Sequence, residues 1–373
     1  DSKIIFGISN VHSRFGMISI IQYLSAIFNN HFFILEFLTL PLATILSFFI
    51  IFLISTFSTL KNNLNLLNFI FLILVVSLYS FSRYSNYGND APSHIYFFLV
   101  AFYFLLSHED KNNFSKILIF SSFLITLKPF MLFVFIIPIV YFLKYKKNNW
   151  IFKRSLIFSF CILFFWILKN IITSGCLIYP VTKTCFSELN YVDKKIIKQV
   201  ETEGEAWSKD VNNFKIDIPL KEYNKVKWIS VWFNNHFKVI IEKVLPIFIF
   251  LIVIFLMKIL RTKLNFKKNK SKFFLNNQFL LIILSLIFSI IWFLKFPIYR
   301  YGMSFIIITI FSIFCFTLTF FEKENSFKKN KKFFSIIVIF GIVMFSFKNV
   351  LRITNLEITN YKNFPWPKIY TLS

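Results

Sequence analysis

The stretch ILIFSSFLITLKPFMLFVFIIPIVYFL, residues 117–143, decides how this chain crosses a membrane. As one helix it would be about 40 Å long, whereas the hydrocarbon core of a bilayer is about 30 Å thick. Lys128 and Pro129 stand near its middle. Proline disrupts helical hydrogen bonding and disfavours helix at the preceding residue, and a lysine at the bilayer centre is costly. We predict two short helices that turn at Lys128–Pro129 near one membrane surface; a single tilted span is the alternative.

The whole composition is that of a membrane protein. The 373 residues are 57% hydrophobic and only 16% charged, whereas about a quarter of the residues in a soluble domain are charged. The apolar runs lack strand-like alternation, so helices are the expected structure. We predict an all-α, polytopic transmembrane helical bundle of about 9–10 membrane segments. The apolar runs cover residues 34–57, 64–81, 93–107, 117–143, 155–172, 238–259, 277–296, 303–321 and 333–347.

The net charge of +25 reflects short basic loops between the apolar runs. In a soluble protein this charge would suggest nucleic acid as a partner. Here the basic loops are 144–154, 258–272 and 327–332, and the positive-inside rule places such loops in the cytoplasm. We therefore expect a lipid bilayer, and no nucleic acid, as the partner of these basic residues. With a turn at Lys128–Pro129, the polar segment 82–94 then faces the outer side.

Two cysteines lie in the one long polar loop, on the predicted outer side. Cys176 and Cys185 bracket a turn-rich segment, and an oxidising compartment favours a disulfide between them; two free thiols are the alternative. We expect this loop to form a periplasmic cap of short helices. The predicted parts are an outer loop with an interfacial amphipathic helix (1–33), an N-terminal transmembrane module (34–172), the periplasmic loop (173–237), C-terminal transmembrane helices (238–347) and a periplasmic tail (348–373).

Asp90 is the first candidate for a functional residue. It lies in the polar segment 82–94, and no other acid occurs between Glu36 and Glu109. Its carboxylate oxygens suit a divalent cation such as Mg or Mn, or could help to activate an acceptor hydroxyl. Alternatively, Asp90 caps the helix that begins at Ala91–Pro92, because Asp before a Pro in the first turn is a common helix start.

Three cations are predicted to lie on the same side as Asp90. Arg14, Lys128 and Arg300 could hold a phosphate, because Arg binds it through two hydrogen bonds and Lys as a point charge. His12 and His94 are weaker candidates for the same site. The alternatives stay open: Arg300 reaches the interface beside its tyrosine neighbours, and Lys128 only marks the outer ends of two helices.

Two short motifs suggest a family. Residues 10–16 fit Asn-x-His-x-Arg-Phe-Gly, and residues 174–180 fit Ser-Gly-x-Leu-Ile-Tyr-Pro. With the order of loops and spans, these motifs resemble the GT-C superfamily of lipid-linked-sugar glycosyltransferases, and most closely uncharacterised bacterial GT-C-like membrane proteins. The resemblance covers most of the chain.

The resemblance implies an inverting glycosyltransferase of the bacterial inner (cytoplasmic) membrane. The expected donor is a polyprenyl-phosphate-linked sugar, and the acceptor a periplasmic glycan or lipid. Asp90 matches the family's second-loop acid, which helps to bind the donor phosphate, sometimes through a metal, and Lys128 matches the lysine of a family turn. The family's catalytic acid lies in the first outer loop. The chain starts partway through that loop, so the resemblance implies an N-terminally truncated protein and leaves the catalytic residue unassigned.

Other classes of membrane protein are weighed against this one. O-antigen polymerases and ligases also carry a long outer loop, but theirs contains arginine, and residues 173–237 contain none. A transporter or flippase predicts internal repeats and helices broken at mid-membrane; the chain has one broken span and no convincing repeat. A structural subunit without chemistry is the third alternative.

Overall fold

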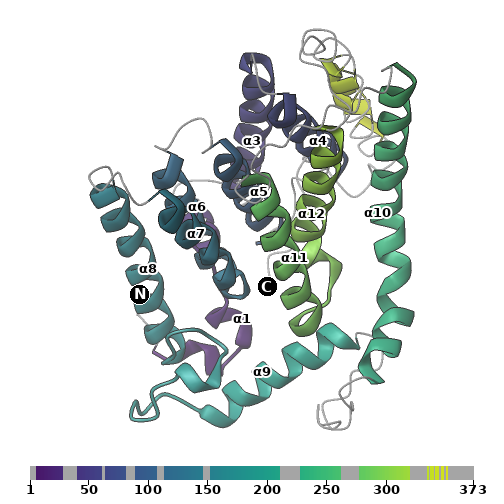
Figure 1. The fold of residues 1–373 in the computed structure, drawn as a ribbon. Coiled ribbons are helices and arrows are strands. Elements are labelled where there is room, and N and C mark those ends of the chain that lie inside the picture. The colour runs from purple at the N-terminus through teal and green to yellow at the C-terminus, as the bar shows by residue number, and fades with distance from the viewer. Residues whose placement is uncertain are drawn as a thin grey trace.

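The computed structural model describes most of the chain as helix. The described residues are 6–27, 40–60, 64–80, 89–106, 113–145, 152–210, 227–261, 277–319 and short helical pieces between 334 and 351. Within them the only β pairing is an isolated bridge between Cys176 and Cys185, so the all-α prediction is confirmed (Figure 1). The α-helices are α1 (Ser13–Gly16), α2 (Ile20–Ile27), α3 (Leu40–Thr59), α4 (Leu64–Ser80), α5 (Asp90–Leu106), α6 (Phe114–Leu127), α7 (Ile136–Tyr145), α8 (Phe152–Ser174), α9 (Lys194–Lys209), α10 (Lys227–Arg261), α11 (Asn277–Lys295) and α12 (Tyr299–Thr319); the 3-10 helices are η1 (Ile8–Asn10), η4 (Pro129–Phe135) and η5 (Thr182–Thr184).

Five described helices are long and apolar enough to cross a membrane: α3, α8, α10, α11 and α12. Four further apolar stretches are shorter, namely Asn65–Tyr79, Asp90–Leu106, Phe114–Leu127 and Pro129–Lys144. In the most hydrophobic window of α12, 61% of the residues are buried, against 22% in α8 and in α10. The outer helices therefore present apolar surface outward, as a lipid bilayer requires. The chain is a helical membrane protein, and the predicted number of crossings stays a prediction.

The stretch 117–143 is broken where the sequence predicted. Helix α6 ends at Leu127, and Lys128 adopts an extended conformation with φ −143° and ψ 107°. The chain continues as the 3-10 helix η4 and then as α7, and α6 packs against both. Pro129 explains the break, because it lacks an N–H and disfavours helix at Lys128. The single tilted span is therefore wrong, and the 3-10 segment is a feature that the sequence did not predict.

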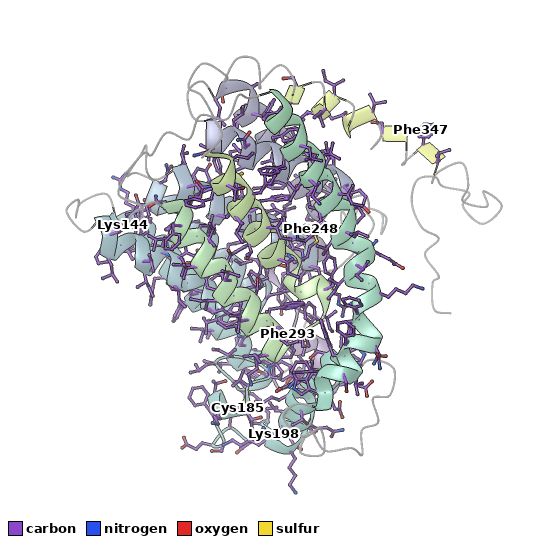
Figure 2. All side chains as sticks on the ribbon, turned by 45° about the vertical axis from the view of Figure 1, so that its right-hand side comes forward. Lys144, Cys185, Lys198, Phe248, Phe293 and Phe347 are labelled. Atoms are coloured by element: carbon purple, nitrogen blue, oxygen red, sulfur yellow. A yellow bond between two sulfur atoms is a disulfide. The ribbon has the colours of Figure 1, made fainter. Side chains whose placement is uncertain are left out.

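The bundle has two distinct ends. An ion pair between Asp90 and Lys128, with Arg300 beside it, joins the start of α5, the turn after α6 and the start of α12. At the other end, Lys144 Nζ donates to Asn277 Oδ1 (2.5 Å), and Asn277 Nδ2 donates to the carbonyl of Phe104 (3.0 Å). We call these the Asp90 end and the Lys144 end. Figure 2 shows Cys185 and Lys198 together at the bottom of the molecule, and Lys144 well away from them at its left edge.

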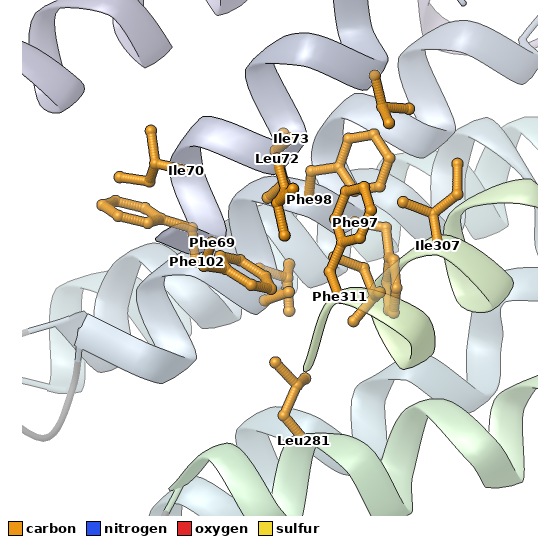
Figure 3. Close-up of a cluster of buried hydrophobic side chains, with 14 of the residues drawn as sticks. Phe69, Ile70, Leu72, Ile73, Phe97, Phe98, Phe102, Leu281, Ile307 and Phe311 are labelled. Atoms are coloured by element: carbon orange, nitrogen blue, oxygen red, sulfur yellow. The ribbon is translucent and has the colours of Figure 1, made fainter. Parts of the chain in front are cut away.

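The centre of the bundle is built from α4, α5, α11 and α12. Figure 3 shows Phe69, Phe97 and Phe311 among the buried side chains that these helices contribute. Phe97 makes an edge-to-face contact with Phe305 at 4.9 Å between ring centroids, a favoured geometry for aromatic pairs. This packing fixes α5 against α12, and so fixes the two helix starts that carry Asp90 and Arg300.

Helix α10 begins earlier than the sequence suggested. It starts at Lys227, inside the stretch 173–237 that was predicted as a loop. Trp228 and Trp232 lie one turn apart and pack on Phe293 of α11, with ring centroids 5.3 Å and 4.9 Å away. The first part of α10 is too polar to be predicted as a helix from hydropathy. Burial of the two indoles against α11 stabilises it.

Candidate functional site: a charged cluster at the Asp90 end

Two tryptophans hold the turn that presents Arg300. Trp292 Nε1 donates to the carbonyl of Ile298 (2.8 Å), and Trp232 Nε1 donates to the carbonyl of Pro297 (2.5 Å). Gly302 lies so close to the Trp292 ring that a Cβ at this position would collide with it. The start of α12 is therefore fixed from both sides.

The start of α5 is tied to the same turn through His94. His94 is only 2% exposed; its Nε2 donates to the carbonyl of Arg300 (2.9 Å), and its Nδ1 lies 2.9 Å from the Ser304 hydroxyl. Asn89, just before the helix, accepts a hydrogen bond from Ser19 Oγ (2.5 Å). His94, a weak candidate ligand in the sequence, thus has both ring nitrogens engaged and positions α5 against α12.

The cluster itself contains one acid, two cations and two aromatic rings. Asp90 forms an ion pair with Lys128, and its Oδ2 lies 4.0 Å from Arg300 Nε. The Lys128 ammonium sits 4.1 Å above the centroid of the Tyr301 ring, and the Arg300 guanidinium lies 5.1 Å from the centroids of Tyr301 and Trp207. The structure thus brings Asp90, Lys128 and Arg300 together, and their formal charges leave an excess of one positive charge.

This arrangement is suited to binding an anion. Two cations that share one carboxylate are only partly neutralised, and a phosphate could take up the remaining charge. Arg300 offers a planar set of donors, and Lys128 a point charge. Because α5 begins at Asp90 and the carboxylate faces the two cations, we read Asp90 as the residue that orients Lys128 and Arg300.

A cap formed by α9 and the preceding loop lies across the Asp90 end (Figure 1). Cys176 and Cys185, for which the sequence left a disulfide and free thiols open, are joined by a disulfide. The Thr182 hydroxyl donates to Glu201 on α9 (2.5 Å). Burial raises the pKa of the Glu201 carboxyl, but hydrogen bonds from Thr182 and Lys198 outweigh it and bring the pKa below its usual value. The first half of α9 is thus fixed to the disulfide loop.

The two motifs of the family resemblance meet beneath this cap. A Cβ on Gly16 would lie 2.7 Å from ring atoms of Tyr179, so the two motifs pack against each other. Lys169 Nζ of α8 donates to the carbonyls of Gly16 (3.2 Å) and Ile18 (3.1 Å). These contacts give the motifs a structural role in holding the N-terminal segment against α8.

Two candidates from the first motif are not placed at the cluster. His12 lies exposed in the turn between η1 and α1. Arg14 belongs to α1, but its side chain is outside the part of the chain that the structure describes, so its phosphate-binding role stays a prediction.

The residues present do not fit a divalent cation. Among the described residues there is no group of three or more His, Cys, Asp or Glu side chains that could hold a metal. Asp90 offers one carboxylate, and both of its charged partners are cations, which would repel a metal ion. We therefore derive no step through the Mg or Mn ion that the sequence suggested.

Sequence reasoning missed Trp207 and Tyr301 as members of the cluster. Trp207 ends an acidic stretch, now part of α9, 93 residues before Arg300 in the chain, and only folding brings the two together. Tyr301 was visible beside Arg300, but it looked like a tyrosine at a membrane interface. No pattern of spacing could have separated these rings from the many other aromatic residues.

Comparison with known families gives one match. Residues 3–307 match the model of a family described as Domain of unknown function (DUF8201), and the chain belongs to that family. The matched range includes Asp90, Lys128, Trp207 and Arg300, so the cluster and the cap lie within it. Searches of curated proteins and of solved structures gave no match.

Proposed function

We propose that this member of the DUF8201 family is an integral membrane glycosyltransferase of the GT-C type. It takes a sugar from a polyprenyl-phosphate donor and transfers it to a glycan or lipid acceptor on the periplasmic side of a bacterial inner membrane. One observation supports this most. Lys128 and Arg300, from distant parts of the chain, share the carboxylate of Asp90 at one end of the bundle, under the cap.

The transfer step assigns a role to each charged residue. The acceptor hydroxyl attacks the anomeric carbon, the bond from that carbon to the phosphate oxygen breaks, and the polyprenyl phosphate leaves with the electron pair. Lys128 and Arg300 stabilise the negative charge that develops on this phosphate, which is a major source of rate enhancement in such reactions. The proton of the hydroxyl passes to a general base. Asp90, engaged by Lys128, holds the two cations in place.

The position of the broken helix favours an enzyme over a transporter. In transporters, broken helices form the substrate site near the middle of the membrane. Here the break at Lys128 lies at an end of the bundle, because Lys128 contacts the first residue of α5. A site at this level is accessible from one side and is compatible with transfer to an acceptor on that side.

The test is transfer of radiolabelled sugar from polyprenyl-phosphate donors in membranes that contain the full-length protein. Lys128→Ala and Arg300→Ala should each lower the rate about 100-fold or more, because removing one group that stabilises the leaving charge has effects of this size. The matched control is Lys198→Ala, which removes a cation of the cap whose side chain is 60% exposed and paired with Glu201. Transfer at the wild-type rate in Lys128→Ala and Arg300→Ala would refute the proposal.

A further inference from the structure

The charged cluster is not equally accessible at all points. The Arg300 side chain is 53% exposed, that of Asp90 35% and that of Lys128 12%. A ligand that enters from the exposed side therefore meets the guanidinium first and the ammonium last. The residues beside Arg300 then determine which group can bind there when that group is attached to a phosphate.

The neighbour of Arg300 on the cap is Trp207. Its ring centroid lies 5.1 Å from the guanidinium carbon, and the residue is only partly buried. A guanidinium covers only part of an indole, so aromatic surface remains next to the phosphate-binding group. Lys128 and Arg300 both lie over the ring of Tyr301, whereas of these two cations only Arg300 lies over the ring of Trp207, which the cap contributes to the site.

The position of Trp207 is set by contacts other than its stack on Arg300. The hydroxyl of its neighbour Ser208 donates to the carbonyl of Glu205 (2.7 Å) and lies 3.4 Å from the carbonyl of Lys295. Glu205 accepts from Lys209 Nζ (2.7 Å), and its second oxygen lies 3.9 Å from Lys295 Nζ. The two contacts with Lys295 place the last turn of α9 against the end of α11. The indole is thus held at the site by the cap itself, whatever Arg300 binds.

We infer that Trp207 recognises the sugar of the lipid-linked donor by stacking against one face of the sugar ring. This rests on the proposed function and adds the residue that selects the glycosylated lipid over the bare carrier. In a glycosyl phosphate the ring is joined to the phosphate through a single oxygen, so it lies beside the group that holds the phosphate. The C–H groups on one face of a sugar ring carry partial positive charge and match the negative face of an indole.

The experiment compares two lipids on purified full-length protein in nanodiscs. The probes are undecaprenyl phosphate and a panel of undecaprenyl-phosphate-linked hexoses (glucose, galactose and mannose). Wild-type protein should bind at least one hexose adduct more tightly than the bare phosphate. Trp207→Ala should weaken binding of that adduct about three- to tenfold, the range that an aromatic contact supplies, and leave the Kd for undecaprenyl phosphate unchanged.

Two further variants make the result specific. Trp207→Phe keeps an aromatic face and should retain most of the preference for the adduct. Phe186→Ala removes another aromatic ring of the cap, 42% exposed and next to the disulfide, and should change neither Kd. Intact disulfide and an unchanged melting temperature show that each variant is folded.

The outcomes separate this inference from the proposed function. Equal weakening of both lipids in Trp207→Ala means that Trp207 acts only through Arg300, and this overturns the inference. Binding of the bare phosphate with no preference for any hexose adduct also overturns it, but leaves the phosphate site in place. If wild-type protein binds neither lipid, the proposed function fails and the inference falls with it.

Discussion

Lys128 is the charged group of the cluster with the least contact with water, since 12% of its side chain is exposed. Its ammonium depends on the carboxylate of Asp90 and on the face of Tyr301. The charge of Asp90 is compensated in more ways, because its side chain is 35% exposed to water and Arg300 also lies near it. The two partners of the ion pair are therefore not equivalent, and removing one should cost more than removing the other.

We predict that Asp90→Ala destabilises the protein more than Lys128→Met does. Losing Asp90 leaves a largely buried ammonium without its carboxylate; such losses cost about 3–5 kcal/mol in full burial, and we expect about 2 kcal/mol at this partly exposed site. The double variant Asp90→Ala/Lys128→Met should recover part of the loss. Melting temperatures in detergent measure this, and equal stability of the double variant and Asp90→Ala would contradict it.

At the scale of elements, the disulfide loop and α9 form the part of the molecule that covers the site. Asp193 accepts from the backbone N–H of Lys195 (2.8 Å) and of Ile196 (3.2 Å), so α9 has a capped start. The Tyr191 hydroxyl donates to the carbonyl of Ile171 (3.0 Å), which ties this region to α8. The cap is thus anchored to α8 before α9 begins and to α11 where it ends.

Removing the disulfide should loosen the cap locally. Closing a loop of this size stabilises a fold by about 2–3 kcal/mol, so Cys176→Ser/Cys185→Ser should expose the segment between the two positions. We expect faster tryptic cleavage after Lys183, which lies exposed in this segment. Reducing agent should have the same effect on the wild-type protein and no added effect on the double variant. Equal cleavage rates in all samples would contradict this role.

In the molecule as a whole, the two ends of the helical bundle differ in chemistry. The Asp90 end carries the charged cluster and the cap, and the Lys144 end joins α7, α11 and the end of α5. The basic loop 144–154 begins at the end of α7. The basic loop 258–272 begins in the last turn of α10. Positive loops stay in the cytoplasm, so the structure and the charge pattern together predict that the Asp90 end faces outward.

Cysteine labelling tests this orientation. The background is Cys161→Ala/Cys315→Ala, because these are the free thiols among the described cysteines. In intact cells, a membrane-impermeant maleimide should label Lys198→Cys at the Asp90 end. It should label Arg154→Cys, at the start of α8, only after permeabilisation. The reverse pattern would place the cluster in the cytoplasm and remove the periplasmic site from the proposal.

The class of fold and the break at Lys128 follow from the amino-acid sequence alone. Apolar runs can satisfy their backbone groups in lipid only as helices, and Pro129 cannot continue a helix whatever surrounds it. The seven residues of η4 and the early start of α10 could not be predicted from the sequence. Local helix propensity is weak, and packing on other helices overrides it.

The composition of the site, by contrast, depends on how the helices pack. Sequence singled out Asp90, Lys128 and Arg300 as polar residues at helix ends, but it could not say that two cations share one carboxylate or that Trp207 lies over one of them. It also could not show that His94 ties α5 to α12. Charge and hydropathy are properties of a residue and its neighbours in the chain. Ion pairs and ring contacts depend on which helix ends meet, and the packing of the apolar helices determines that.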